Sequence, residues 1–452
     1  MVSRLIAPII VVCFVVLSPV GAQVVDWVSI GTGGAAGTGD SGLEDARRAI
    51  SADGRFVVFE SAADNLVAGD LNGDLDVFRR DLVLGTTVRV SVSNTGGDAL
   101  GPSENPSISG DGRYIAFASM AGNIVAGDGN TDWDVFVRDM QTGITARISV
   151  SSAGGDPDGP SNRPSISADG SLVAFSSSAT NLVPGFATAA VDIYLRDLVA
   201  QQTTLVSIGY DGNSGNLNSW RPEISPDGSK VAFVSGATNI VPGDAASPDV
   251  FLRDLGIGTT MRISVDQWGG DPDDRSGPPS LSYDGRVVAF WSRATDLVIG
   301  DTNGQDDIFV WDADVGVLER VNVANDGSQA LGGGSWHTAV SGDGRYVAFL
   351  SDASNLVPDD INGWGDIFAY DRHTATIELL SVNDSHEQAN GFSRFPSVTP
   401  EGNTVVFEST AGNFIVGDDN GLMDVYVGHG PAAILVDGFS TGDTTGWSLT
   451  IR

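Results

Sequence analysis

The chain has 452 residues, of which 41% are hydrophobic and 18% charged, and its formal net charge is −34. A negative charge of this size excludes nucleic acid and anionic membrane surfaces as partners, because both are polyanions. The chain is long enough to bury a large core, and its excess of aspartate over glutamate favours turns over helices and supplies oxygen ligands for hard metal ions.

Residues 1–22 have the features of a secretory signal peptide. Arg4 gives a basic start, residues 9–17 are apolar, and residues 20–22 resemble a small-residue cleavage site. The apolar run is shorter than the roughly 20 residues that span a bilayer, so we expect an exported protein, periplasmic or extracellular, without a membrane span. Cleavage removes Cys13, the single cysteine, so the mature chain forms no disulfide.

A short signature recurs along the chain, with an acid followed by glycine at its centre. Its spacings are 58, 58, 58, 57, 59 and 58 residues, which are too regular for chance and indicate a repeat architecture. The signature acids are Asp53, Asp111, Asp169, Asp227, Asp284, Asp343 and Glu401.

Each repeat is predicted to contain four short strands. Strand A precedes the signature, as in residues 163–167, and the Asp-Gly pair forms a hairpin turn because glycine accepts positive φ. Strand B follows, as in 346–351; strand C is exemplified by 76–78 and strand D by 89–92. A phenylalanine stands six residues after the acid in every copy: Phe59, Phe117, Phe175, Phe233, Phe290, Phe349 and Phe407.

Four-stranded units repeated seven times predict an all-β protein, a seven-bladed β-propeller. The last repeat ends at strand C, residues 424–427, and lacks strand D. Residues 27–30 match strand D, so the N-terminal strand is expected to complete the last blade and close the ring, which hides the sheet edges. The predicted parts are the signal peptide 1–22, the propeller 23–430 and a C-terminal tail 431–452.

The run 164–170, followed by Val173, Ala174 and Phe175, resembles the TolB-type propeller repeat, a WD-like blade of exported bacterial proteins. The resemblance covers nearly the whole mature chain. It implies a propeller fold and a habit of binding partners, without implying a reaction.

The loops between strands B and C carry alternating aspartate and asparagine in blades 1, 2, 5, 6 and 7. Such oxygen atoms can converge on calcium, which takes six to eight oxygen ligands. The alternative is that these side chains form local turns and that the last aspartate starts strand C. The candidate calcium ligands are Asp70, Asn72, Asp74, Asp76, Asp128, Asn130, Asp132, Asp134, Asp301, Asn303, Asp307, Asp360, Asn362, Asp366, Asp418, Asn420 and Asp424.

Strand A lies innermost in a propeller, so the residues that enter it ring the mouth of the central channel. Aligned on the signature, these are Arg47, Asn105, Arg163, Arg221, Pro278, His337 and Phe395. Arginine and tryptophan are favoured at recognition hot spots, so we expect an anionic group or a peptide end to bind here; the alternative is that each arginine pairs with a nearby aspartate. The predicted ligand-binding residues are Arg47, Arg163, Arg221, Trp220, Trp336, His337 and Arg394.

Enzyme chemistry has little support in the sequence. The four histidines fall at non-equivalent positions of the repeat, and no Gly-x-Ser-x-Gly motif is present. We therefore predict a monomeric, non-enzymatic propeller that binds a protein or peptide through the face with the long B–C and D–A connections, with calcium as a candidate cofactor. The alternative is a carbohydrate-active enzyme, a polysaccharide lyase or glycoside hydrolase, on the same face.

Overall fold

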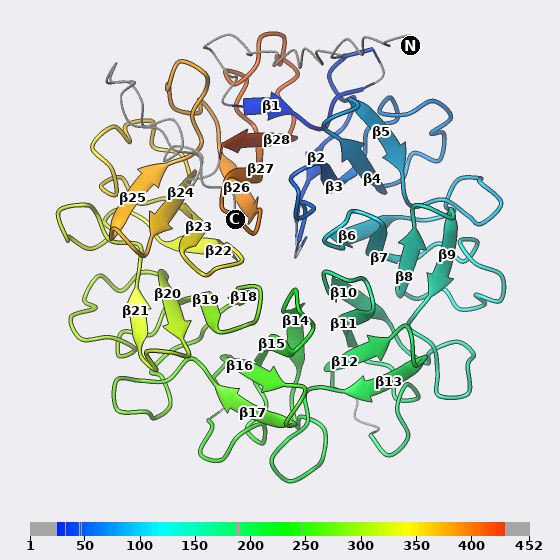
Figure 1. Cartoon of the computed structure of the whole chain (residues 1–452), viewed down its shortest axis with the longest axis horizontal. Coiled ribbons are helices and arrows are strands. Elements are labelled where there is room, and N and C mark those ends of the chain that lie inside the picture. Colours follow the sequence, from blue (N-terminus) through cyan, green and yellow to red (C-terminus); the bar gives the residue numbers. More distant parts are fainter. Residues whose placement is uncertain are drawn as a thin grey trace, which may run out of the picture.

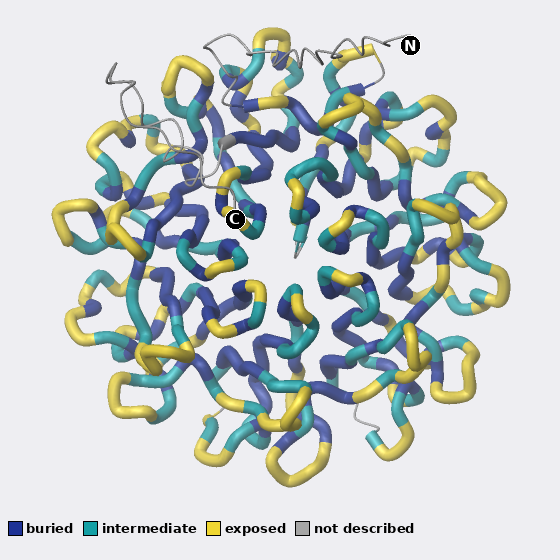
Figure 2. Tube along the Cα trace, in the orientation of Figure 1, coloured by how far each residue is buried: buried dark blue, intermediate teal, exposed yellow. Residues whose placement is uncertain are grey.

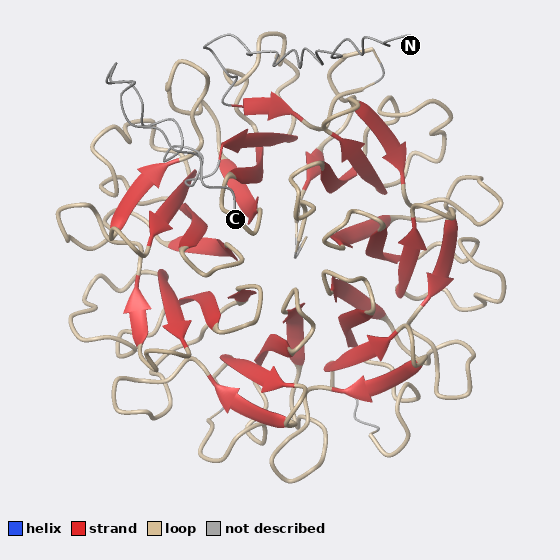
Figure 3. Cartoon of the chain, in the orientation of Figure 1, coloured by secondary structure: helices blue, strands red, loops and turns tan. Residues whose placement is uncertain are grey.

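The computed structural model describes residues 25–429 except 32, 45, 47, 187–189 and 246. Seven four-stranded antiparallel sheets form a ring around a central channel (Figure 1); exposed residues gather at the loops (Figure 2). The described part contains only strands and loops (Figure 3), and so no helix in it is able to cross a membrane. The predicted all-β, seven-bladed propeller is confirmed, whereas the predicted signal peptide and C-terminal tail lie outside the described residues.

Blades 1 to 6 each contain four consecutive strands, A to D from the channel outwards, and blade 7 combines β26–β28 with β1. The A strands are β2 (Ser41–Gly42), β6 (Ser103–Ile108), β10 (Ser161–Ile166), β14 (Ser219–Ile224), β18 (Ser280–Leu281), β22 (Ser335–Val340) and β26 (Ser393–Val398). The B strands are β3 (Phe56–Ser61), β7 (Tyr114–Ser119), β11 (Leu172–Ser177), β15 (Lys230–Ser235), β19 (Val287–Ser292), β23 (Tyr346–Ser351) and β27 (Thr404–Ser409). The C strands are β4 (Asp76–Asp81), β8 (Asp134–Asp139), β12 (Asp192–Asp197), β16 (Asp249–Asp254), β20 (Asp307–Asp312), β24 (Asp366–Asp371) and β28 (Asp424–His429). The D strands are β5 (Thr86–Arg89), β9 (Ile144–Arg147), β13 (Gln202–Leu205), β17 (Thr259–Arg262), β21 (Leu318–Arg320), β25 (Thr376–Leu379) and β1 (Val25–Trp27).

Strand D lies earlier in the chain than predicted. In blade 1 it ends at Arg89, where the prediction began it. The amides of Val90 and Ser91 both point to the carbonyl oxygen of Val77, at 2.7 and 3.4 Å. Because two successive amides share one acceptor, the regular ladder stops, and the chain leaves the edge of the blade at this point.

The N-terminal strand closes the ring as predicted, although it begins at Val25 and not at Trp27. β1 pairs antiparallel with β28, and the side chains of Val25 and Val28 are fully buried. The hydroxyl of Ser29 donates a hydrogen bond to Asp424 at the start of β28, at 2.6 Å. The first and the last described strands therefore lie in the same blade (Figure 1).

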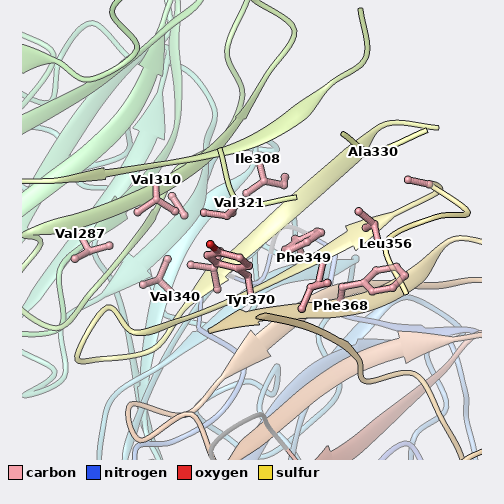
Figure 4. Packing of buried hydrophobic residues seen from close by; sticks show 14 residues of the cluster. Val287, Ile308, Val310, Val321, Ala330, Val340, Phe349, Leu356, Phe368 and Tyr370 are labelled. Carbon is pink, nitrogen blue, oxygen red and sulfur yellow. The ribbon is translucent and has the colours of Figure 1, made fainter. Parts of the chain in front are cut away.

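The hydrophobic core lies between the blades. The phenylalanine of strand B is fully buried in all seven blades, and its ring faces an aromatic ring of strand C, as in Phe349 and Phe368, whose centroids are 6.1 Å apart. Figure 4 shows how Val310 of blade 5 and Val340 and Tyr370 of blade 6 belong to one cluster. Each blade therefore buries its faces against its neighbours, as repeat architectures require.

The repeated signature is a hairpin turn closed by side chains. The hydroxyl of Ser51 donates to a carboxylate oxygen of Asp53 at 2.6 Å, and the same oxygen accepts the amide of Arg55 at 3.1 Å. The Ser51 oxygen also accepts the amide of Phe56 at 2.9 Å. Gly54 has a φ of 72°, a conformation that glycine adopts without strain. These local bonds explain why the same residue types recur in blades 1 to 6; in blade 7 the hydroxyl of Thr399 bonds to Asn403 at 2.8 Å.

Candidate ligand-binding site at the channel mouth

The A strands begin on the face that carries the long B–C and D–A connections, which we call the long-loop face. In five blades a β-bulge interrupts strand A at one position, and a bulge changes the direction in which a side chain points. Pro278 takes this position in blade 5, and Arg47 of blade 1 lies outside the described residues. The bulged residues, all with positive φ, are Asn105 (52°), Arg163 (52°), Arg221 (54°), His337 (54°) and Phe395 (51°). They are the positions that the sequence placed around the mouth.

These bulged residues adopt an unfavourable backbone conformation. A positive φ costs a residue with a side chain about 1 kcal/mol or more. Elsewhere the chain mostly uses glycine for this conformation, as in the A–B turn of every blade, with φ between 64° and 74°; the described exceptions are Gln201 (55°), Ala375 (54°) and His386 (60°). None of the five bulged residues at the mouth is glycine. Side chains are retained here in spite of the cost, which is typical of functional sites.

Four residues of the predicted ring come together in one pocket. Arg221, Pro278, His337 and Phe395 line it, together with Trp291 of strand B. The rings of His337 and Phe395 stack with a centroid distance of 4.0 Å and an interplanar angle of 24°. The guanidinium group of Arg221 therefore lies beside apolar and aromatic side chains. This arrangement suits a ligand in which an anionic group is attached to an apolar group.

Arg394 lies in a different environment from the one predicted. Its Nε bonds to the carboxylate of Glu408, which is fully buried, and its guanidinium lies 5.0 Å from the centre of the Phe395 ring. For this arginine the structure therefore shows the alternative arrangement, a pairing with an acid.

Three further predicted residues, Arg163, Trp220 and Trp336, are half-buried and lie outside the pocket of Arg221, whereas Arg47 is not among the described residues. Arg163 is the bulged residue of β10, and Trp220 lies opposite Val234 in blade 4. The indole of Trp336 donates a hydrogen bond to Asp306 at 3.0 Å, which orients its ring.

The residue that follows the phenylalanine of strand B also lies at the mouth, although the repeat pattern did not indicate it. This position is Glu60 in blade 1, Glu408 in blade 7 and Trp291 in blade 5. Glu60 accepts the amide of Asn105 at 2.9 Å, and burial raises the pKa of Glu60 to about 8. Glu60 and Glu408 line a cleft with Arg394 at the junction of blades 7 and 1. Aligning the repeats on the phenylalanine would have revealed this column, because other blades have small or aliphatic residues there.

Two of the four predicted calcium ligands of blade 1, Asp70 and Asp76, contact an arginine at the end of strand D. Nη1 of Arg89 lies 2.7 Å from Asp70 and 3.1 Å from Asp76, and Nη2 bonds to Asp98. The guanidinium supplies the positive charge that these buried carboxylates require. The corresponding arginines in blades 2, 4 and 5 are Arg147, Arg262 and Arg320.

The asparagines of the predicted calcium loops form local turns. Asn72 donates to Asp76 at 2.9 Å and accepts the amide of Asp74 at 3.3 Å. The asparagine-to-aspartate bond recurs in the other four loops, between Asn130 and Asp134, Asn303 and Asp307, Asn362 and Asp366, and Asn420 and Asp424. The turn interpretation thus describes these bonds, and calcium binding stays a prediction.

Blade 4 lacks the alternating pattern in its B–C loop but has three acids at the corresponding place in the blade. Asp244, Asp249 and Asp271 each offer a ligand atom, and these atoms lie within 4.8 Å of one another. Arg262 lies between them, with Nη1 3.1 Å from Asp244.

Blades 6 and 7 differ from this arrangement. In blade 6, Leu379 takes the position of the arginine, and burial raises the pKa of Asp366 to about 6. In blade 7 the position belongs to Trp27, and the hydroxyl of Tyr426 donates a hydrogen bond to Asp418.

No protein-family model matches the chain, and no curated protein matches it. Among solved structures, oligogalacturonate lyase from Vibrio parahaemolyticus is 14% identical with a TM-score of 0.55, over 90% of this chain and 97% of that one. An oligogalacturonate lyase in complex with manganese is 12% identical with a TM-score of 0.55, over 91% and 98%. TolB from Acinetobacter baumannii is 17% identical with a TM-score of 0.39, over 67% of this chain and 58% of that one. At such identities the likeness concerns the fold alone: the chain is a seven-bladed β-propeller.

Proposed function

We propose that the protein is an exported, non-enzymatic binding protein that holds an anionic group of a protein or peptide partner at the channel mouth. The observation that carries this proposal is the row of five bulged residues that have positive φ and are not glycine. A fold that only had to close its ring would gain from glycine at these positions. Arg221 and His337, set against the rings of Phe395 and Trp291, give the mouth the chemistry for such a group.

Changing both Arg163 and Arg221 to glycine tests the proposal. We expect binding to fall at least tenfold, because the cations are lost, whereas the chain stays folded, because glycine relieves the backbone strain at both positions. Fluorescence anisotropy with a library of short peptides that carry free carboxylates measures binding, and urea denaturation measures stability.

Ala375→Gly is the matched control for that experiment. Ala375 has a φ of 54° in the C–D turn of blade 6, far from the mouth, so its replacement relieves the same strain and leaves binding unchanged. Retained binding in a folded double variant contradicts the proposal, and so does an equal loss of binding in Ala375→Gly.

The second candidate function is a carbohydrate-active enzyme, a polysaccharide lyase or glycoside hydrolase. The cleft with Glu60 and Glu408 favours it, because a carboxyl whose pKa is raised to about 8 is protonated at neutral pH and can act as a general acid. The two solved structures of oligogalacturonate lyases also share the fold. A panel of polysaccharides distinguishes the candidates: an enzyme shows turnover that Glu60→Gln or Glu408→Gln abolishes, whereas a binding protein shows none.

We also propose blade 6 as the place where calcium would contribute to stability. Asp360 and Asp366 are buried there, and Leu379 takes the place of the arginine found in blades 1, 2, 4 and 5. We expect EDTA to lower the melting temperature of the wild type, and we expect Leu379→Arg to remove this effect, because a guanidinium then supplies the charge. If EDTA leaves the melting temperature unchanged and the purified protein contains no calcium, the proposal that calcium stabilises blade 6 is wrong.

A further inference from the structure

The innermost strands share a residue type just inside the mouth, and blade 1 departs from it. The position after the bulged residue is proline in blades 2, 3, 4, 5 and 7, and it is Thr338 in blade 6. In blade 1 it is Arg48. The long charged side chain therefore stands in the channel at a level where the other blades present a short one.

The side chain of Arg48 crosses the channel. Its Nη1 donates to the carbonyl oxygen of Ile166 at 2.6 Å, and its Nη2 donates to that of Ile224 at 3.5 Å. Ile166 and Ile224 end β10 and β14, in blades 3 and 4, whereas blade 1 adjoins blades 2 and 7. The segment between β2 and β3 correspondingly enters the central opening (Figure 1).

Glu223 stabilises the charge of Arg48 inside the ring. It replaces a serine that in other blades accepts an amide of the next A strand, as Ser165 does from Ile224 at 3.1 Å. Glu223 keeps this role, accepting the amide of Leu281 at 3.0 Å. Burial lowers the pKa of Arg48, and the negative charge of Glu223 acts in the opposite direction.

The A–B turns of neighbouring blades line the channel at the next level, below Arg48. Backbone hydrogen bonds join neighbouring turns there: the amide of Ala52 donates to Gly110 and that of Gly110 to Ala168, both at 2.9 Å. Arg48 and Glu223 line the cavity at this level. Among the described residues, none lines both this cavity and the mouth pocket of Arg221. Arg48 therefore reaches across the channel at the level of the lower cavity, which the mouth pocket does not share.

We propose that Arg48 forms a positively charged floor beneath the mouth, and that the mouth accepts the carboxyl terminus of a linear peptide, not a segment that passes through the ring. The inference rests on the proposed binding function and names its ligand. A chain that meets a floor is bound by its end, and a terminal carboxylate matches guanidinium groups at the mouth and beneath it. Pro278, Phe395 and Trp291 offer apolar walls for the last side chain, whereas the hydroxyls of a sugar would find few polar partners there.

Four probes test the ligand: a linear hexapeptide ending in leucine, its C-terminal amide, its head-to-tail cyclic form and a linear oligogalacturonide. We expect the free acid to bind at least tenfold more tightly than each of the others. Equal binding of acid, amide and cyclic peptide, all lost in the variant with glycine at positions 163 and 221, would overturn the inference and leave the proposed function standing. Tighter binding of the oligogalacturonide, or no binding of any of the four, would also overturn it, and the peptide library would then judge the proposed function separately.

Two variants test the floor. Arg48→Thr introduces the residue of blade 6, and we expect the ratio of acid to amide affinity to fall at least threefold. Arg48→Lys retains a charge and is expected to keep most of the ratio. Because a ratio is measured, a loss of folded protein affects both probes equally, and thermal melting reports the fold. An unchanged ratio in Arg48→Thr would show that Arg48 does not act on the ligand.

Discussion

Replacing Arg89 by leucine is expected to lower the free energy of unfolding by about 3–5 kcal/mol, the usual effect of removing one partner of a buried ion pair. The change leaves Asp70 and Asp76, which are 6% and 0% exposed, without their positive partner. Leucine fits the site sterically, because Leu379 stands at this position in blade 6. Urea denaturation of the variant and the wild type measures the difference.

The same variant has an expected dependence on pH. Burial already raises the pKa of Asp70 to about 6, and the loss of Arg89 raises it further. A group whose pKa is raised by folding stabilises the protein at low pH and loses this contribution as the pH rises through the folded value. The deficit of Arg89→Leu relative to wild type should therefore be smaller at about pH 5 than at about pH 8.

Arg293→Leu is the matched control. Its Nε lies 3.8 Å from Asp274, and the two side chains are 50% and 47% exposed, so we expect a change below about 1 kcal/mol. An equally small effect for Arg89→Leu, or a deficit that is larger at low pH, would show that these buried carboxylates do not depend on the arginine.

Removing the N-terminal strand is expected to have the largest effect of all. A chain that begins at Gly31 loses the burial of Val25, Trp27 and Val28, which are 0%, 9% and 0% exposed. At about 1.5–3 kcal/mol for each buried side chain, the loss is comparable to the whole stability of a typical domain, about 5–15 kcal/mol. The free edge of β28 would also pair with other chains, so we expect oligomers or an unfolded chain by light scattering and urea denaturation.

A chain that begins at Gln23 is the reference for this experiment, and Asp26→Ala is the control within the strand, because Asp26 is exposed in β1. The reference and the control are expected to remain folded monomers of equal stability. A stable monomer from the chain that begins at Gly31 would show that β1 is dispensable for ring closure.

The architecture was predictable because its determinants are local and repeated. The signature is closed by bonds among neighbouring residues, as between Ser51 and Asp53, and the phenylalanine of strand B meets strand C of the same blade, as Phe59 meets Phe78. Each copy of the repeat therefore contains the residues that determine its own sheet, and the number of copies predicts the number of blades. The N-terminal strand was recognisable because it resembles the strand D that the last repeat lacks.

The candidate site was predictable only in part, because its details depend on contacts between blades or between distant parts of one blade. Alignment placed Arg221 and His337 at the mouth, yet nothing local in the sequence shows a bulge or a positive φ. The sequence pattern places Arg89 at the start of strand D and gives no sign of its partners. Only the folded blade brings Arg89 to Asp70 of the B–C connection and Asp98 of the D–A connection. Likewise, the contact from Arg48 to Ile166 joins residues 118 positions apart.

The enclosure of arginines by aspartates has a consequence for the rate at which a ligand arrives. Arginines such as Arg147 and Arg262 are buried inside the blades, where their side chains are 6% and 7% exposed. Because the protein has a net charge of −34, its outer surface is therefore dominated by acidic side chains. An anionic peptide end approaches against this field until it is within about one Debye length of the mouth, about 10 Å at 0.1 M salt. Its association rate should therefore increase as ionic strength rises from low values, the reverse of the usual electrostatic steering between opposite charges.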